Sequence, residues 1–126
     1  MKMNTRRPVF FNLAQIQMPV GALTSITHRI TGILLAIGIP FTVYLLDLSL
    51  QGPQSYAWVI RLFGEWYIKV VAIVFIWALA HHLLAGVRHL LSDIDIGSLL
   101  PAGRRSAWIV NIAGLIVALL ATGALL

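Results

Sequence analysis

Apolar residues run through three long segments of this 126-residue chain, and each segment is long enough to cross a lipid bilayer. The pattern predicts helices at about residues 20–50, 66–91 and 106–126. A helix rises about 1.5 Å per residue, so roughly 20 apolar residues cover the hydrocarbon core. Backbone groups must be paired within the bilayer, and the alternating pattern of a barrel strand is absent. We therefore interpret residues 1–126 as one all-α integral membrane domain with three transmembrane helices.

The polar residues mark the ends of these segments and indicate how the chain is oriented. Positive charges gather in the N-terminal arm and the second loop, at Lys2, Arg6, Arg7, Arg88, Arg104 and Arg105. The first loop, residues 47–65, holds only Arg61, which is offset by two acids. Cytoplasmic loops carry the excess of Lys and Arg. We therefore expect the N-terminus in the cytoplasm and the C-terminus in the periplasm.

Two further features refine the first predicted helix and the loop after it. Aromatic residues in and around this loop are typical of an interfacial belt and comprise Tyr56, Trp58, Trp66 and Tyr67. Within the first helix, Pro40 should produce a kink, because proline has no N–H for the helical hydrogen bond.

Composition supports a membrane protein and excludes several classes of soluble protein. Hydrophobic residues make up 60% of the chain and charged residues 10%, whereas soluble domains have about 25% charged residues. With no cysteine, the chain offers no disulfide, no thiolate zinc site and no ligand for an iron–sulfur cluster. The net charge of +5 does not indicate nucleic-acid binding, because the basic residues lie at the ends of apolar segments.

Ionisable residues inside a membrane are costly, so those within the predicted spans are candidates for function. Acidic residues are missing from the spans, which argues against a transporter driven by carboxylate protonation. The basic set comprises four histidines and two arginines: His28, Arg29, His81, His82, Arg88 and His89. These six residues are the candidates for binding a cofactor or substrate.

Among the histidines, His82 is the strongest candidate for a metal ligand. It shares one helix face with Gly86 and His89, and small residues flank it: Ala78, Ala85 and Gly86. A flat macrocycle approaches a helix only where such side chains are small, so we expect His82 to be a haem axial ligand. His81 points about 100° away, onto a more crowded face, and we interpret it as structural. The alternative for each histidine is a hydrogen bond to a helix carbonyl or packing between helices.

A polar cluster is expected at the cytoplasmic end of the first helix. Ser25 and Arg29 are i, i+4 neighbours that face the same way, and His28 lies beside them. The second helix runs antiparallel, so Arg88 and His89 return to the same depth. Such a cluster suits haem propionates, which pair with cations, and a quinone carbonyl, which needs a donor and a nearby cation. Alternatively, the arginine of the second helix sets topology and the serine bonds its own backbone.

One ligating histidine cannot provide both axial ligands of a six-coordinate haem, so the second must come from another chain. Three helices also form a thin bundle around a group of this size. We therefore expect this chain to form half of a two-subunit haem-binding bundle. The cytoplasmic segments are too short for a catalytic domain, so a soluble partner would dock there. We expect no catalytic residue in this chain alone.

Two motifs resemble the cytochrome b membrane-anchor subunit of bacterial succinate dehydrogenase, the larger of its two anchor chains. The first motif is residues 25–32, Ser-Ile-Thr-His-Arg-Ile-Thr-Gly, preceded by Arg7-Pro8 and Pro19. The second reads His82-x-x-x-Gly86-x-Arg88-His89-x-x-x-Asp93. The three-helix layout extends the resemblance over essentially the whole chain.

The resemblance implies a role for each matching residue. His82 would be the axial ligand of the haem b iron, and His28 and Arg29 would contact the haem propionates. Ser25 and Arg29 would bind ubiquinone, and Asp93 near the cytoplasmic mouth is a candidate for delivering protons to it. Asp95 is a further candidate for a proton path, outside the matching motif.

The resemblance also implies partners and a location. The partners are a smaller anchor subunit with the second haem histidine, an iron–sulfur subunit and a flavoprotein subunit. The complex would carry electrons from succinate to ubiquinone at the bacterial inner membrane, with this chain as a multi-pass anchor. Two alternatives remain: a fumarate reductase anchor that uses menaquinol, and a haem-free membrane scaffold or assembly protein.

Overall fold

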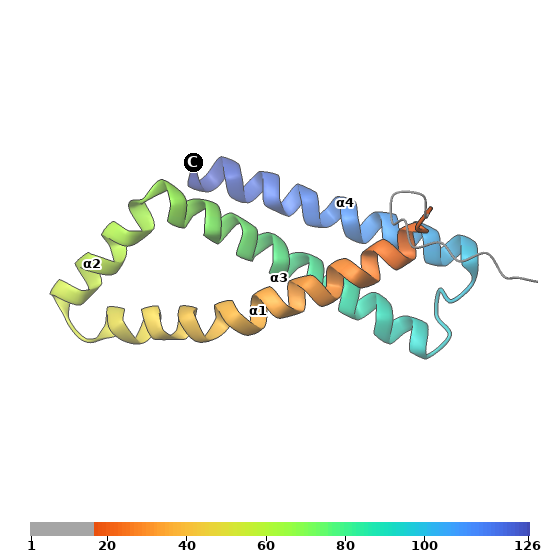
Figure 1. The fold of residues 1–126 in the computed structure, drawn as a ribbon, viewed down its shortest axis with the longest axis horizontal. Helices are drawn as coiled ribbons and strands as arrows, with labels where there is room; N and C mark the ends of the chain where they lie inside the picture. The colour runs from red at the N-terminus through yellow and green to blue at the C-terminus, as the bar shows by residue number, and fades with distance from the viewer. Residues whose placement is uncertain (1–16) are drawn as a thin grey trace, which may run out of the picture.

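Four helices make up nearly all of the computed structural model, which describes residues 17–126. In chain order they are α1 (Val20–Leu50), α2 (Pro53–Gly64), α3 (Trp66–Asp93) and α4 (Leu100–Leu125) (Figure 1). The basic arm with Lys2, Arg6 and Arg7 lies outside the described residues. No strand occurs within residues 17–126, so the expected all-α fold is confirmed.

Three of the helices, α1, α3 and α4, are long and apolar enough to cross a membrane. The third spanning helix was predicted to begin near residue 106, but α4 begins at Leu100. Pro101 lies in its first turn, where a backbone N–H has no partner within the helix and its loss costs nothing. Consequently Arg104 and Arg105 belong to α4, and the connection from α3 is shorter than expected.

The segment predicted to be the first loop contains a helix, α2. The prediction of a loop without a helix was therefore wrong. Gly52 precedes α2 at φ 158, and Pro53 occupies the first turn, which suits a helix start. The sequence does carry the signal: Tyr56, Val59, Ile60 and Phe63 are spaced i, i+3, i+4 and i+7. α2 is too short for a span, and Val59 is its buried residue.

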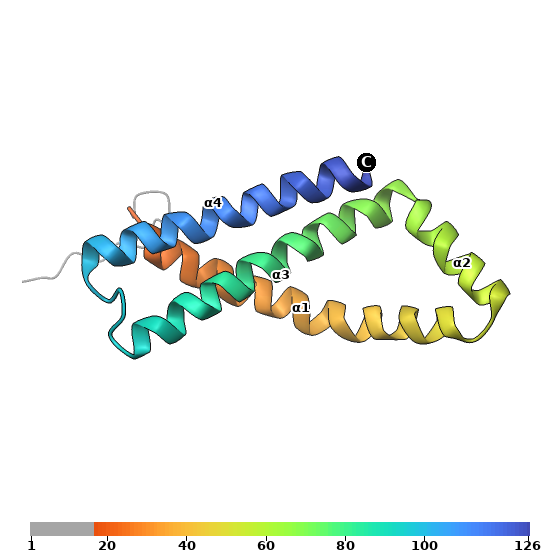
Figure 2. The same ribbon diagram turned by 180° about the vertical axis from the view of Figure 1, so that it is seen from behind.

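The helices are arranged as a crossed pair with a third alongside. α1 and α3 cross near the middle of the molecule, and α4 runs along α3 (Figures 1 and 2). α2 joins the ends of α1 and α3 that diverge from this crossing. α1 continues through Pro40 without a break and bends along its length in both views.

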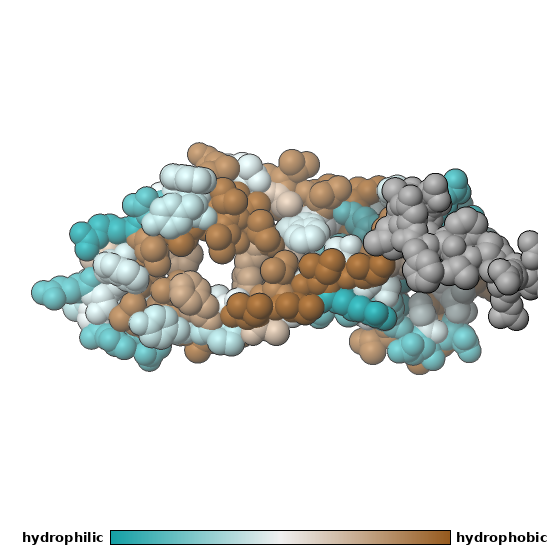
Figure 3. Space-filling model, in the orientation of Figure 1, coloured by the Kyte–Doolittle hydropathy of each residue, from teal (hydrophilic) through white to brown (hydrophobic). Residues whose placement is uncertain are grey.

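The interior of this arrangement is thin and its fully buried apolar residues are small. Ala78, Ala85 and Ala107 are fully buried, which lets helix backbones approach closely, as at interfaces between membrane helices. Leu35 and Leu45 are also buried, but most large apolar side chains lie outside, and Leu119 is 72% exposed. Apolar residues cover the middle of the molecule and polar ones its two ends (Figure 3). Large apolar residues on the surface fit an environment of lipid and further protein rather than water.

Candidate functional site

Three imidazoles from α1 and α3 gather on one side of the helix crossing. The rings of His28 and His82 are stacked, with centroids 4.1 Å apart and planes inclined by 11°. His89 lies about two turns further along α3, with its ring centroid 5.2 Å from that of His28 and tilted by 57°. The structure thus brings His28 of α1 against both histidines of the predicted His82–Gly86–His89 face of α3.

The hydrogen bonds of His82 determine which of its ring nitrogens carries the proton. His82 Nδ1 lies 3.1 Å from the His28 carbonyl oxygen and 3.3 Å from Thr31 Oγ1. The Thr31 hydroxyl donates to the same carbonyl at 2.9 Å, so both partners accept from His82. The proton is therefore on Nδ1, and the lone pair is on Nε2. This is the tautomer of a histidine that ligates a metal through Nε2 and is oriented by a carbonyl.

Glycines provide the room that this arrangement needs. A Cβ placed on Gly32 would lie 3.0 Å from His82 Cε1, closer than side chains normally approach. A Cβ on Gly86 would lie 3.5 Å from His28 Nε2, an ordinary contact. The His82 ring therefore packs directly against the backbone of α1 at Gly32.

Two of the small residues expected beside His82 lie elsewhere. Ala78 and Ala85 are fully buried, and their i−3 and i+4 spacing places them on the face of His81. They therefore close the interface between helices and leave no space for a macrocycle. Gly86 is the flanking small residue that remains on the imidazole side.

His81 is enclosed between α3 and α4. It is 1% exposed, and its Nε2 lies 3.0 Å from Asn111 Oδ1. Trp77 lies beside it, with ring centroids 5.8 Å apart. A Cβ on Gly114 of α4 would meet both of these side chains at 3.5 Å, so the packing is close. A ligand has no access to His81 in this position.

Arg88 is directed to α4 rather than to the imidazoles. Its Nε donates to Ser106 Oγ at 3.0 Å, and its Nη2 donates to the Gly103 carbonyl at 3.2 Å. The guanidinium also lies beside the first turn of α1, since a Cβ on Gly21 would be 3.5 Å from Nη2. Arg88 therefore joins the two helix starts at this end of the molecule.

The remaining predicted site residues lie around this cluster with less contact. Ser25 is half-buried and Arg29 is exposed, and within residues 17–126 neither side chain has a hydrogen-bond partner. Asp93 is exposed at the end of α3, and Asp95 follows in the turn with φ 61. The structure places Ser25, Arg29 and Asp93 toward the end of the molecule where α4 begins, but not within the stacked imidazoles.

Three polar residues near the site were not singled out from the sequence. Thr31 is fully buried and contacts His82, and Thr24 and Asn111 hydrogen-bond to one another. Thr31 lies three residues after His28 and so shares its face, which the sequence shows. Asn111 is a polar residue inside an apolar span, and the side chains of such residues hydrogen-bond to neighbouring helices.

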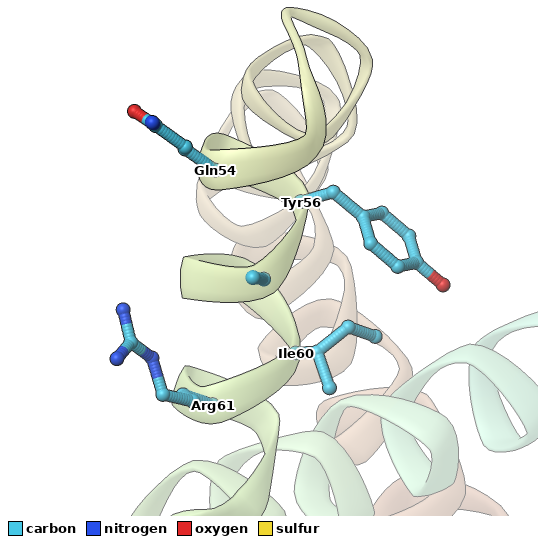
Figure 4. A pocket seen from close by; sticks show the side chains of 5 residues that line it. Gln54, Tyr56, Ile60 and Arg61 are labelled. Atoms are coloured by element: carbon cyan, nitrogen blue, oxygen red, sulfur yellow. The ribbon is translucent and has the colours of Figure 1, made fainter.

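A broad depression lies elsewhere within the described residues, on α2. It measures about 640 Å³ and is lined by Gln54, Tyr56, Ala57, Ile60 and Arg61. Figure 4 shows the side chains of Gln54 and Arg61 extending away from the helix on one side, and Tyr56 and Ile60 on the other. It is shallow and contains no histidine, so the imidazole cluster is the better candidate for cofactor chemistry.

Comparison with known proteins identifies the family. The sequence model of the family described as "Succinate dehydrogenase/Fumarate reductase transmembrane subunit" matches residues 3–122. The chain belongs to this family. The two motifs that contain His28 and His82 lie within the matched range, as do the three spans. The resemblance inferred from these motifs is therefore confirmed.

Individual relatives agree with the family. The chain is 34% identical to the succinate dehydrogenase cytochrome b556 subunit of Coxiella burnetii, over 94% of this chain and 96% of the relative. It is 32% identical to the cytochrome b556 subunit of Paracoccus denitrificans, over 90% and 88% of the two chains. The cytochrome b560 subunit of Reclinomonas americana is 29% identical, over 72% and 67%. With its three spanning helices, the chain is a multi-pass subunit of the bacterial inner membrane.

Proposed function

We propose that this chain anchors a succinate dehydrogenase, binds haem b together with a second anchor subunit and forms part of the ubiquinone-reduction site. The observation that carries the proposal is the tautomer of His82, whose Nδ1–H bonds to the His28 carbonyl and whose Nε2 lone pair is available. Family membership and the cytochrome b names of the relatives support it.

His82 fits the role of an axial ligand. When bound, haem b supplies a redox centre for one-electron transfer. The hydrogen bond from Nδ1 makes Nε2 more basic, and the stacked His28 ring and Thr31 hold the imidazole in one orientation. The three imidazoles are not arranged to hold one metal ion among the described residues, and His28 and His82 stack face to face, so His82 would act as a single protein ligand from this chain. The second axial histidine would come from the smaller anchor subunit.

His28 and Arg29 are suited to hold the haem propionates. His28 lies directly against the proposed ligand, and Arg29 follows it on the exposed surface of α1. A guanidinium binds carboxylates through two parallel hydrogen bonds. Within residues 17–126 the Arg29 guanidinium makes no hydrogen bond, and its position on the exposed surface of α1 suits contact with a bound group.

Ser25 and Arg29 are suited to bind the quinone. They lie one helical turn apart on α1, and both side chains remain available within residues 17–126. The Ser25 hydroxyl would donate to a quinone carbonyl, and the Arg29 charge would stabilise the negative charge that reduction produces. Asp93, exposed at the end of α3, would deliver protons from the cytoplasm.

The other functions of the complex would belong to partners. The chain has no cysteine for iron–sulfur clusters, so electrons from succinate would arrive through an iron–sulfur subunit and a flavoprotein subunit. These would dock at the end of the single anchor domain that carries Arg88, Arg104 and Arg105. We place this end and the N-terminus in the cytoplasm, and the C-terminus in the periplasm.

A second candidate function is favoured by the description of the family, which includes fumarate reductase. In that case the same site would oxidise menaquinol, and electrons would flow in the opposite direction. The residues proposed above would bind either quinone, because both offer a carbonyl or hydroxyl to Ser25 and Arg29.

Purification of the complex in mild detergent tests the proposal. We expect flavoprotein, iron–sulfur and second anchor subunits to co-purify, a b-type reduced-minus-oxidised spectrum, and faster succinate-driven reduction of a ubiquinone analogue than of a menaquinone analogue. Preferred oxidation of a menaquinol analogue by fumarate would favour the second candidate. A complex without b-type bands would refute haem binding and favour a scaffold protein.

A further inference from the structure

A buried polar network links all three spanning helices next to the proposed haem ligand. It consists of Thr24 of α1, His81 of α3 and Asn111 of α4, and we call it the Asn111 network. Asn111 Nδ2 donates to Thr24 Oγ1 at 3.0 Å, and Asn111 Oδ1 lies 3.0 Å from His81 Nε2. Thr24 is fully buried and His81 is 1% exposed, so these groups depend on one another for partners.

The shorter contacts of Thr24 assign the donors and acceptors of the network. The Thr24 hydroxyl has two acceptors within reach, the Val20 carbonyl at 2.9 Å and Asn111 Oδ1 at 3.3 Å, and we assign its proton to the shorter bond, so that its oxygen accepts from the amide of Asn111. This orients Asn111 with its carbonyl oxygen toward His81, and a carbonyl oxygen only accepts. His81 therefore carries its proton on Nε2. Its Nδ1 is buried without a hydrogen-bond partner among the described residues.

Consecutive histidines are thus held in opposite tautomers by different helices. His82 has its proton on Nδ1, which bonds to α1, and its Nε2 has the lone pair that a metal needs. His81 has its proton on Nε2, which bonds to α4, so that nitrogen has no lone pair to offer. Neighbouring residues on a helix point about 100° apart, so both bonds are made only when α3 has one rotation about its axis.

We propose that Asn111 is a positioning residue for haem ligation, which fixes the rotation of α3 through His81 and so selects His82 over its neighbour as the axial ligand. The proposal rests on the proposed role of His82. Without Asn111, both nitrogens of His81 would be buried without partners in this position. Burying unpaired ring nitrogens costs free energy, and a rotation of α3 that exposes His81 would remove this cost. The same rotation would displace His82 from Gly32 and Thr31.

The test uses the purified complex with Asn111→Leu and, as a matched control on the same helix, Thr122→Val. Within residues 17–126, the Thr122 hydroxyl bonds only the Ala118 carbonyl of its own helix, so its loss leaves the network intact. The readout is the electron paramagnetic resonance of the ferric haem, whose largest g value responds to the orientation of the axial imidazoles. We expect a shifted or second low-spin signal and reduced haem content in Asn111→Leu, and a wild-type signal in Thr122→Val.

A double variant tests whether the effect passes through His81. Adding His81→Phe to Asn111→Leu removes both the unsatisfied imidazole and the competing ligand. We expect the wild-type haem signal to return, and His81→Phe alone to keep it. Lowered thermal stability of Asn111→Leu with an unchanged haem signal would overturn the proposal, as would failure of the double variant to restore the signal.

A spectroscopic measurement does not require the variants at Asn111 to assemble. ¹⁵N spectra of histidine-labelled wild-type and His81→Phe complexes, taken as a difference, report the protonated nitrogen of His81. A proton on Nε2 supports the proposal and a proton on Nδ1 overturns it. If His82→Ala retains its b-type haem, the proposed function itself fails. If His82→Ala loses the haem but the ¹⁵N spectra place the proton of His81 on Nδ1, only the Asn111 proposal fails.

Discussion

His28 contacts His82 twice, through its ring and through its backbone. The two imidazoles stack with centroids 4.1 Å apart, and the His28 carbonyl oxygen lies 3.1 Å from His82 Nδ1. Since the carbonyl belongs to the backbone of α1, no substitution of the His28 side chain removes it. The orientation of His82 therefore depends on the position of α1 as a whole, and changes at the α1–α3 crossing should affect any group bound to His82.

Gly32→Ala should disturb His82 although alanine is the better helix former. The added methyl group would lie 3.0 Å from His82 Cε1, and overpacking of this kind typically costs about 1–3 kcal/mol. We expect haem content to fall in the purified complex, as measured by the pyridine haemochrome. Gly123→Ala is the matched control, since nothing lies within 4 Å of its added Cβ. Equal haem content in both variants would show that the ring has room to move.

Thr31→Val should weaken haem binding, whereas Thr31→Ser should not. Valine has nearly the same shape but leaves His82 Nδ1 with the His28 carbonyl alone. Loss of such an outer partner typically lowers metal affinity by about 10-fold to 100-fold. Haem retention during dilution in detergent measures the difference. If valine and serine retain haem equally, the hydroxyl does not support the ligand.

The sequence predicted the parts of this structure that depend on local pattern. The three spans follow from the length of the apolar segments, and the face shared by His82 and His89 follows from helical spacing. The periodic signal of α2 is also present in the sequence, although the segment is too short for a span and was interpreted as a loop.

The parts that the sequence did not predict depend on contacts between distant residues. Asn111 is 30 residues from His81 and 87 residues from Thr24, and no periodicity relates them. Arg88 was expected at the same depth as Arg29, but it hydrogen-bonds to Ser106 and Gly103, because α4 begins at Leu100 and its first turns lie beside α3. Helix rotation and boundaries are set by such contacts.

Arg29→Ala should separate quinone reduction from succinate oxidation. Arg29 is exposed on α1 and has no partner within the described residues, so its loss should leave the fold intact. We expect succinate-driven ubiquinone reduction to fall by roughly 100-fold to 1,000-fold, by analogy with removal of one charge-stabilising donor, while dye reduction by the soluble subunits is kept. Equal loss of both activities would indicate a docking or folding role.

Arg88→Ala should act on stability instead. The variant loses two charge-assisted hydrogen bonds that tie α3 to the start of α4, which we expect to cost about 1–3 kcal/mol. Thermal unfolding of the complex measures this loss, and quinone reduction per assembled complex should change little. A variant with normal thermal stability and defective quinone reduction would place Arg88 in the quinone site.

The orientation can be checked by labelling α2 from outside the cell. The chain has no cysteine, so Gln54→Cys adds one thiol, on an exposed residue of α2. We expect a membrane-impermeant maleimide to label this chain in spheroplasts, because the proposed orientation places α2 at the periplasmic end. Labelling only in inverted vesicles would reverse the orientation.

The central claim is that His82, and not its neighbour, binds haem through Nε2. The most direct measurement is the reduced-minus-oxidised spectrum of purified complexes carrying His82→Ala and, as the matched control, His81→Phe. We expect the b-type bands to be lost or shifted in His82→Ala and to be retained in His81→Phe. Unchanged bands in His82→Ala, or loss of the bands in His81→Phe alone, would contradict the claim.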